Sequence, residues 1–285
     1  MDRKISSVFK KKKFSPLWIL AVFFAIVWLV ITGGPFVFQI IATFKTEGEF
    51  ITTSLFKLPK SLNFANYATV FQGGFGQYFL NSSIVIVFSL TLLLFLSAFA
   101  AYPLSRMQFR LNRPIYAAIV ALMSIPIHIT LIPIFVMSIR IHFYDKVYAL
   151  IGPNVAFNLP MSIFILTAFM QTISREMEEA ADIDGCGKFS TFFRIIFPLS
   201  KSGLATLGIY NGVVIWNEFL FAMVLTQSVP ARTLPLAVWQ YQGQYSMNIP
   251  VIMTVLGLSS LPVILLYVFG QDKLVKGMMA GAVKG

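Results

Sequence analysis

Acidic side chains gather in one short stretch, "EEAADIDG" at residues 178–185, which holds four carboxylates and a glycine. Carboxylates this close together typically do general acid–base work or bind divalent cations, and both activities require further partners such as a histidine or more oxygen ligands. The acid cluster at 176–184 contains no histidine and no obvious set of metal ligands. The chain also lacks the G-x-x-x-x-G-K-[ST] phosphate loop and the H-E-x-x-H zinc motif. We therefore expect no catalytic residue and no metal site in this chain.

A second group of polar residues interrupts an apolar run, in the segment "NGVVIWNEF" at 211–219. Its members are Asn211, Asn217 and Glu218. A lone acid in an apolar helix usually faces the interior of a helix bundle or a water-filled cavity, because lipid does not solvate it. One helical stripe contains Gly208, Asn211, Ile215, Glu218 and Ala222. Such a stripe suits either a wet pathway or a close helix contact, and the pattern leaves both roles open.

The elements that position these residues are membrane spans. The chain is 57% hydrophobic and 12% charged, with a mean hydropathy of +0.79, far from the composition of an ordinary soluble domain. A helix of about 20 apolar residues crosses ~30 Å of hydrocarbon. We predict six spans, at residues 17–41, 80–103, 115–137, 147–171, 202–226 and 249–271.

Long, continuously apolar runs predict helices, since a membrane barrel needs short strands of alternating polarity. Several prolines fall inside the predicted spans, where each kinks or interrupts its helix and requires neighbours to satisfy the freed carbonyl groups: Pro126, Pro133, Pro153, Pro160 and Pro262. The predicted fold is therefore an all-α membrane protein in which six transmembrane helices form a bundle.

The distribution of basic residues predicts the orientation, because lysine and arginine are retained on the cytoplasmic side. Sixteen of the 22 basic residues lie in the two termini, the second-to-third connection and the fourth-to-fifth connection. This places both termini and residues 172–200 in the cytoplasm. The basic charges flank spans instead of clustering on one soluble face, which argues against nucleic acid as a partner. Lys10–Lys13 are expected to lie on anionic membrane lipid.

The connection at 172–200 has the pattern of two short helices. Ser174 can cap the first helix, and Gly185 offers the left-handed residue that ends it. Helical spacing predicts an acidic face made of Glu178, Glu179 and Asp182, opposite a face made of Met177, Ala180 and Ala181. The second helix would carry an apolar face, Phe189, Phe192, Phe193 and Ile196, and would end at Pro198 before the fifth span.

A hairpin on the membrane surface is one interpretation of this connection, with its phenylalanines among the lipid headgroups. Anionic lipid repels the predicted acidic face, however, whereas a soluble partner with a basic cleft would complement it. We therefore favour a docking element for another protein.

The segment "EAADIDG", followed by nine residues and "IIFP", resembles the E-A-A-x-x-x-G-x9-I-x-L-P signature of permease subunits of binding-protein-dependent ABC importers. Six residues match the signature: Glu179, Ala180, Ala181, Gly185, Ile195 and Pro198. Phe197 stands in place of the usual leucine, and Cys186 stands where alanine is common. The segments "WNEFLFA" at 216–222 and "GAVKG" at 281–285 resemble the sugar branch of the family, and in particular its maltose-permease type.

This resemblance implies a non-enzymatic subunit that forms half of the translocation pathway of an ATP-driven carbohydrate importer. The implied partners are a second homologous permease, a cytoplasmic ABC ATPase dimer and an extracytoplasmic sugar-binding protein. ATP and Mg would be bound by the ATPase, with no cofactor in this chain. The residues implied to couple to the ATPase are the six signature residues and Asp182 of the same loop. Because the family shares "WNEF" across different sugars, the resemblance favours a structural role for Glu218 over sugar recognition.

The expected organisation has three parts. Residues 1–75 hold a cytoplasmic tail, the first span and an outer loop; residues 76–271 form the permease core with the coupling loop at 172–200; residues 272–285 form a cytoplasmic tail.

Two alternative functions belong to other classes of membrane protein. An ion-coupled secondary carrier usually needs several intramembrane ionisable groups, and a polytopic membrane enzyme needs a catalytic cluster at one membrane face.

Overall fold

Four long helices set the architecture. The computed structural model describes residues 16–240 and 248–282, and every regular element within these ranges is helical. Four helices are individually long and apolar enough to cross a membrane: α1 (Pro16–Thr43), α4 (Phe75–Arg106), α7 (Ile151–Gln171) and α14 (Ile249–Ala282). They match the first, second, fourth and sixth predicted spans.

Two further spans are bent pairs of helices. The third predicted span, 115–137, is not one helix but α5 (Asn112–Leu122) and α6 (Ile127–Arg140), which meet at 93°. Pro126 lies at the break in an extended conformation, and a proline disfavours helical geometry in the residue before it. With both bent pairs counted, the described part of the chain has up to six spans.

The second bent pair contains α11 (Lys201–Trp216) and the short helices before it, α9 (Lys188–Thr191), the π-helix η2 (Phe192–Ile196) and α10 (Phe197–Leu199). The two parts meet at 68°. The remaining short elements are α2 (Glu47–Thr52), α3 (Ala65–Gln72), η1 (Val147–Leu150), α8 (Glu176–Ile183), α12 (Leu220–Leu225), η3 (Val229–Ala231) and α13 (Leu234–Gln240).

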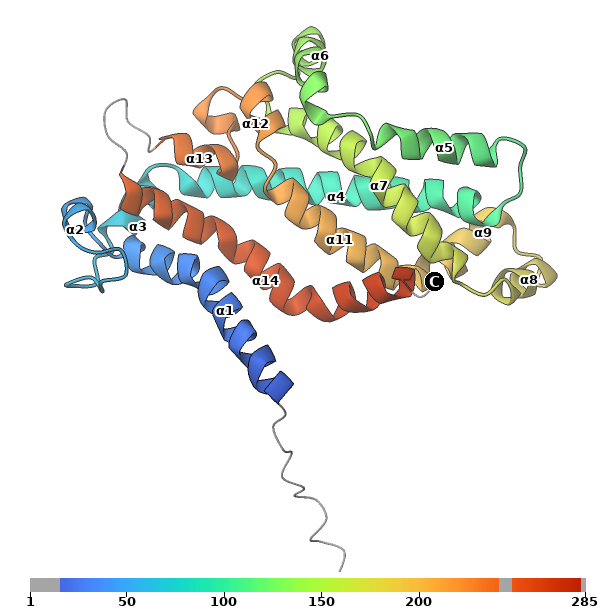
Figure 1. The fold of residues 1–285 in the computed structure, drawn as a ribbon. Helices are drawn as coiled ribbons and strands as arrows, with labels where there is room; N and C mark the ends of the chain where they lie inside the picture. The colour runs from blue at the N-terminus through green and yellow to red at the C-terminus, as the bar shows by residue number, and fades with distance from the viewer. Residues whose placement is uncertain (1–15, 241–247, 283–285) are drawn as a thin grey trace, which may run out of the picture.

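Helix α4 lies at the centre of the bundle. Figure 1 shows α4, α11 and α14 side by side along the molecule, with α8 and α9 at one end and α2 and α3 at the other. Every fourth residue of α4 is buried, in a row that consists of Asn81, Val85, Ser89, Leu93, Ser97 and Ala101. Small side chains in this row let α7 and α11 approach closely, as is usual between membrane helices.

Helix α1 lies at the edge of the bundle and packs against α14. Its buried residues, Ala42 and Thr43, are at its C-terminal end, and most of its remaining length exposes apolar side chains. This surface suits contact with lipid or with another spanning helix. The predicted lipid contact of Lys10–Lys13 lies outside the described residues.

The predicted C-terminal tail, residues 272–285, begins inside a helix. Helix α14 continues without a break through residue 272, where the tail was predicted to begin, and ends at Ala282. The last residues of "GAVKG", 283–285, lie outside the described part of the chain.

Candidate functional site

Helix α8 lies at one end of the molecule, in the connection between α7 and α9 (Figure 1). The Ser174 hydroxyl accepts a hydrogen bond from the Glu176 N–H at 3.3 Å, but the N-cap residue of α8 is Arg175, so Ser174 lies one position before the predicted cap. At the other end Gly185 has a φ of +77°, and the Cys186 N–H donates to the Ala181 carbonyl at 2.9 Å. This is the left-handed helix termination predicted for Gly185. Both ends of α8 are therefore fixed by local hydrogen bonds.

The predicted acidic face and the predicted apolar face of α8 both contain exposed residues. Ala181 is 3% exposed and faces the molecule, while Met177 and Ala180 are exposed. Ile183, 86% exposed, lies close to them on the free side of the helix. The exposed surface therefore combines small and apolar side chains with acids, and Glu179 is one of those acids.

The other two acids of the predicted face are paired within the chain. Glu178 turns toward α4, where its Oε1 lies 3.0 Å from Nε of Arg106. Asp182 accepts hydrogen bonds from the ammonium group of Lys188 at 2.8 and 3.0 Å. Helical spacing places the three acids on one face. It carries no information about which neighbouring elements supply basic partners for them.

The segment after α8 also differs from its predicted apolar face. Phe192 and Ile196 are buried against α4, α7 and α11, whereas Phe189 and Phe193 are exposed. The π-helical turn accounts for this division, because it widens the helix and shifts residues away from the 3.6-residue period. Of the two remaining signature residues, Ile195 is half-buried. Pro198 is exposed and precedes by two residues Ser200, the junction with α11.

The fifth predicted span, 202–226, is also not continuous. Helix α11 ends at Trp216, and α12 begins at Leu220. The predicted stripe from Gly208 to Ala222 therefore does not run along one helix. The three polar candidates, Asn211, Asn217 and Glu218, occupy three different environments.

Asn211 is fully buried and links two helices. Its side-chain amide donates to the Ser162 hydroxyl of α7 at 3.0 Å and to the Leu207 carbonyl at 3.1 Å. These contacts suit helix association, not a wet pathway.

The Glu218 side chain caps the start of α12 from the position before Phe219, the N-cap residue. Its two carboxylate oxygens accept hydrogen bonds from the N–H groups of Phe221 at 2.7 Å and Ala222 at 3.2 Å. A carboxylate at the start of a helix satisfies N–H groups that have no partner within the helix, and it also favours the positive end of the helix dipole. This geometry is that of a structural residue that holds the break between α11 and α12.

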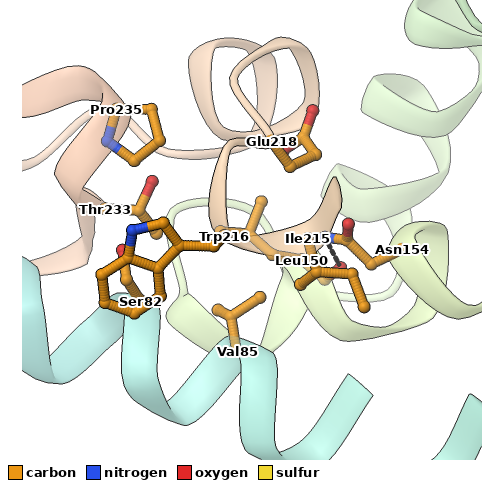
Figure 2. Close-up of a pocket in the computed structure, with 9 residues that line it drawn as sticks. All are labelled: Ser82, Val85, Leu150, Asn154, Ile215, Trp216, Glu218, Thr233 and Pro235. Atoms are coloured by element: carbon orange, nitrogen blue, oxygen red, sulfur yellow. Dashed lines mark hydrogen bonds between the residues drawn. The ribbon is translucent and has the colours of Figure 1, made fainter. Parts of the chain in front are cut away.

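Residues from several elements surround this break. Figure 2 shows a small cavity lined by α4, η1, α7, the α11–α12 break and the start of α13, with Glu218, Asn154 and Thr233 among its polar residues. The α4 side is tied to the loop before α13, since the Asn81 amide donates to the carbonyls of Pro230 and Arg232 at 2.7 Å. The Ser82 hydroxyl accepts the Leu234 N–H at 2.9 Å.

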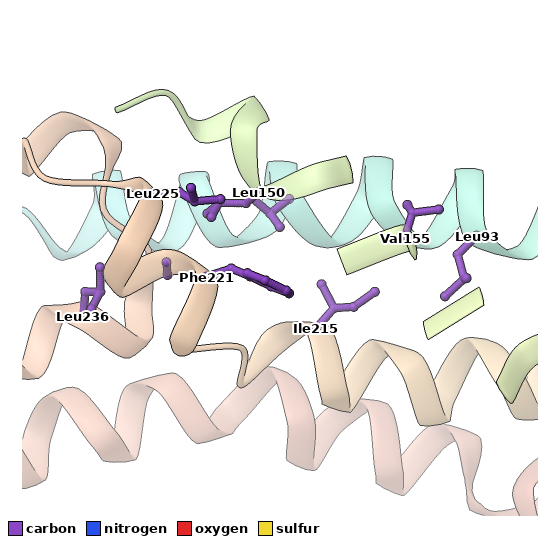
Figure 3. Close-up of a cluster of buried hydrophobic side chains, with 9 residues drawn as sticks. Leu93, Leu150, Val155, Ile215, Phe221, Leu225 and Leu236 are labelled. Atoms are coloured by element: carbon purple, nitrogen blue, oxygen red, sulfur yellow. The ribbon is translucent and has the colours of Figure 1, made fainter. Parts of the chain in front are cut away.

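Apolar packing holds the same break from the other side. Figure 3 shows Phe221 and Leu225 of α12 in a cluster with Ile215 of α11 and Leu150 of η1, and all four side chains are buried. Between membrane helices such side chains stabilise the fold through close van der Waals packing, since lipid supplies no hydrophobic driving force for helix association. Helix α12 is therefore packed into the bundle, and its position is fixed relative to α11.

Asn217 lies at the break as well, but its side chain is exposed. It lines a hollow of about 690 Å³ between α1, α13 and α14, together with Gln39, Trp216 and Ser260. Most of its lining is apolar, and the side chains of Gln39, Asn217 and Ser260 each donate to a backbone carbonyl, so their oxygens remain to accept hydrogen bonds from a hydroxylated molecule. Among the three polar candidates, Asn217 is the one that faces open space.

Two polar residues with specific contacts were missed by the sequence analysis. Arg106 was counted only as a basic loop residue, yet its side chain is 3% exposed and contacts Glu178. Asp145 lies in the connection between α6 and η1 at a φ of +58°, and its Oδ1 accepts the N–H groups of Gln227 and Ser228 at 2.8 and 2.9 Å. Each contact joins positions far apart in the sequence, so no local pattern signals it.

Within the described residues, no group of three or more histidines, cysteines or acids is arranged to hold a metal ion. Two of the acids of α8, Glu178 and Asp182, pair with basic side chains of the chain itself. The arrangement therefore offers a docking helix at one end and polar groups around a break in the bundle.

Comparison with known proteins places these features in context. Residues 93–280 match the model of a family described as "binding-protein-dependent transport system inner membrane component". A relative from Caldicellulosiruptor sp. (strain Rt8B.4), whose name assigns it as an ABC transporter permease, is 51% identical over 262 residues, which cover 92% of this chain and 95% of the relative.

A second relative, the melibiose/raffinose/stachyose import permease protein MelC of Bacillus subtilis (strain 168), is 31% identical over 88% of this chain and 91% of its own length. Among solved structures, a chain of a bacterial ABC transporter involved in the import of the acidic polysaccharide alginate superposes with a TM-score of 0.81. That match covers 93% of this chain and 98% of the other at 20% identity, and at this identity the likeness concerns the fold.

Proposed function

The chain belongs to the family of inner membrane components of binding-protein-dependent transport systems, and from that premise we propose that it imports carbohydrate as the permease subunit of an ATP-driven complex. It is a multi-pass membrane protein with the fold of an ABC importer permease. The names of relatives support carbohydrate as the substrate class, since MelC is named for oligosaccharide import and AmyC of Thermoanaerobacterium thermosulfurigenes for starch degradation products. An ion-coupled carrier and a membrane enzyme are not favoured, because neither is consistent with this family.

The observation that carries the coupling role is the form of α8. It is a short helix with both ends fixed, and it presents Glu179, Ala180 and Ile183 to solvent. A small residue between an acid and an apolar side chain allows close approach of a partner surface, while the acid selects a basic cleft. This partner is a cytoplasmic ABC ATPase dimer, which binds ATP and Mg, while this chain has no catalytic role.

The remaining signature residues support this role from behind the exposed surface. Ala181 packs α8 against the molecule, and Asp182 links α8 to α9 through Lys188. Gly185 forms the turn, and Ile195 and Pro198 lie in the segment that leads into α11. A displacement of α8 would thus be transmitted to the α11 span.

The proposed pathway runs along the break between α11 and α12. Asn217 faces the hollow and can exchange hydrogen bonds with sugar hydroxyls, whereas Asn211 and Glu218 hold the surrounding helices. A second permease would complete the pathway, and the exposed apolar surface of α1 is suited to it or to lipid. The bias of basic residues puts both termini and α8 in the cytoplasm and leaves the α2 end to an extracytoplasmic sugar-binding protein.

Transport by the assembled complex tests this function. The chain would be purified together with a second permease, an ATPase and a binding protein of the same transport system, and then reconstituted into liposomes. We expect uptake of at least one sugar from a panel of mono- and oligosaccharides. Uptake should require the binding protein, and it should require ATP on the side of the membrane where the ATPase lies. Uptake driven by an ion gradient without ATP would contradict the proposal.

A further inference from the structure

Arg106 is the last residue of α4 and lies at a junction of three helices. Its Nη2 donates to the carbonyl of Ile173, just after α7, at 2.6 Å. Its Nε lies 3.0 Å from Oε1 of Glu178, in the first turn of α8. One guanidinium group therefore contacts α4, the end of α7 and α8 at once.

The ion pair is buried. The Arg106 side chain is 3% exposed and the Glu178 side chain 14%, whereas the Lys188 and Asp182 side chains of the neighbouring pair are 55% and 48% exposed. Charges are weakly screened in such a position, and separating them leaves each in an environment that solvates it poorly. The first turn of α8 is therefore strongly held to the end of α4.

The end of α4 is itself fixed. The Asn112 amide, at the start of α5, donates to the carbonyls of Met107 at 2.9 Å and Leu104 at 3.2 Å. A second contact between α4 and the coupling segment is aromatic: the rings of Tyr102 and Phe192 have centroids 5.2 Å apart. Helix α8 thus has a polar attachment to α4, separate from the apolar contact made by the segment that leads into α11.

We propose that the Arg106–Glu178 ion pair is the link through which movement of α8 is passed to the α4 span. The apolar contact of Phe192 can slide, whereas the Arg106 guanidinium group is oriented by its hydrogen bond to the Ile173 carbonyl and attracts the Glu178 carboxylate 3.0 Å away, without a hydrogen bond from Nε to Oε1. Because α8 is attached to both α4 and α11, it moves with the bundle as a rigid unit. The inference rests on the proposed function, because it assigns positioning residues to the ATPase-coupling helix.

The test compares charge reversals in the complete reconstituted complex. Arg106→Glu and Glu178→Arg each place like charges together, and the double variant restores opposite charges. Sugar uptake and ATP hydrolysis are measured in the same liposomes. We expect each single variant to lower the sugar transported per ATP hydrolysed by about fivefold or more, the range typical of coupling between sites, and the double variant to recover most of the loss.

Arg110→Glu is the matched control, because Arg110 lies in the same connection and is exposed. It should leave the ratio of uptake to hydrolysis unchanged. If a reversal prevents assembly, Glu178→Gln supplies the test, since it removes the charge with little change of size. The ratio should then fall as well.

An unchanged ratio in Glu178→Gln, or a double reversal no better than the single ones, would overturn the link. A general loss of stability would lower assembly without changing the sugar transported per ATP. Failure of the proposed function has a different signature, because the unaltered complex would then show no ATP-driven sugar uptake at all.

Discussion

The sequence pattern around Glu218 is compatible with a structural role and with sugar recognition. Only the contacts of Glu218 distinguish the two roles. Both of its carboxylate oxygens accept N–H groups of α12, while its neighbour Asn217 faces the hollow. A break in the helix after Trp216 separates the two side chains, and neither proline nor glycine lies at 217–219 to signal it. The sequence therefore identified these polar residues but placed them on one continuous helix.

Removing the cap at Glu218 should affect stability more than sugar recognition. Glu218→Ala leaves two N–H groups of α12 without their acceptors and is expected to lower the free energy of unfolding by about 0.5–2 kcal/mol. Glu218→Gln retains one acceptor and should lose less. Thermal unfolding of the purified complex and uptake at a series of sugar concentrations measure the two effects.

Asn217→Ala is the matched variant, since Asn217 is adjacent and exposed. It should weaken the apparent affinity for sugar and leave the unfolding temperature nearly unchanged. A Glu218→Ala complex that assembles normally but selects different sugars would place Glu218 in the pathway.

Asp145 makes a pH-dependent contact between the α6–η1 connection and the segment that follows α12. Burial alone would raise its pKa, but hydrogen bonds from the N–H groups of Gln227 and Ser228, with Lys146 nearby, outweigh burial and lower the pKa of Asp145. A carboxyl group whose pKa is lower in the folded state stabilises the fold above its unfolded pKa of about 3.9, and this stabilisation is lost as the pH falls through the folded pKa. The contact should therefore hold at neutral pH and weaken in acid below about pH 4.

Asp145→Ala is expected to destabilise this contact by about 1 kcal/mol at neutral pH, whereas Asp145→Asn keeps one acceptor and tolerates the positive φ. Hydrogen exchange of the Gln227 and Ser228 amides at several pH values measures the effect. Protection in the unaltered protein should fall in acid more than in Asp145→Asn. Equal pH dependence in both proteins would show that Asp145 does not control the contact.

At the scale of elements, hydropathy and length predicted the long helices well because a membrane span needs a long apolar run whatever it packs against. Pro126 signalled an interruption of the third span, yet the 93° angle depends on how α5 and α6 pack. The glycine that ends α8 was predicted because a left-handed termination is a local property. The π-turn at Phe192–Ile196 and the Arg106–Glu178 pair were not, since both depend on tertiary contacts.

Close packing of α11 against α7 gives a test at this scale. A Cβ atom at Gly203 would lie 2.8 Å from Cγ of Phe169, too close for any real contact, so Gly203→Ala must displace the ring. We expect a loss of about 1–3 kcal/mol in the free energy of unfolding, as is typical of overpacking.

Gly208→Ala is the control on the same helix, because its Cβ would meet Leu94 at an ordinary 3.7 Å. Alanine also has a better helix propensity by about 1 kcal/mol, so this variant should be neutral or stabilising. Thermal unfolding of both purified variants measures the difference. A Gly203→Ala protein as stable as Gly208→Ala would show that α7 and α11 are less closely packed at this point than the structure has them.

For the whole molecule, the all-α membrane fold predicted from the sequence is confirmed by the similarity to an alginate ABC transporter chain. The family resemblance of "EAADIDG" is confirmed by the family match over residues 93–280. Individual residue roles stay predictions, because similarity at the level of the fold does not assign them. The proposed coupling depends on one connection, in which the exposed side of α8 would join the membrane helices to an ATPase.

Glu179→Lys tests that connection most directly. Glu179 is exposed on α8, so reversing its charge leaves the bundle intact but opposes a basic cleft on the partner. The measurement is sugar uptake together with sugar-stimulated ATP hydrolysis in liposomes that contain the complete complex. We predict that the variant inserts and folds normally, that uptake falls to background and that hydrolysis no longer responds to sugar. Near-normal uptake and stimulation in the Glu179→Lys complex would contradict coupling through α8.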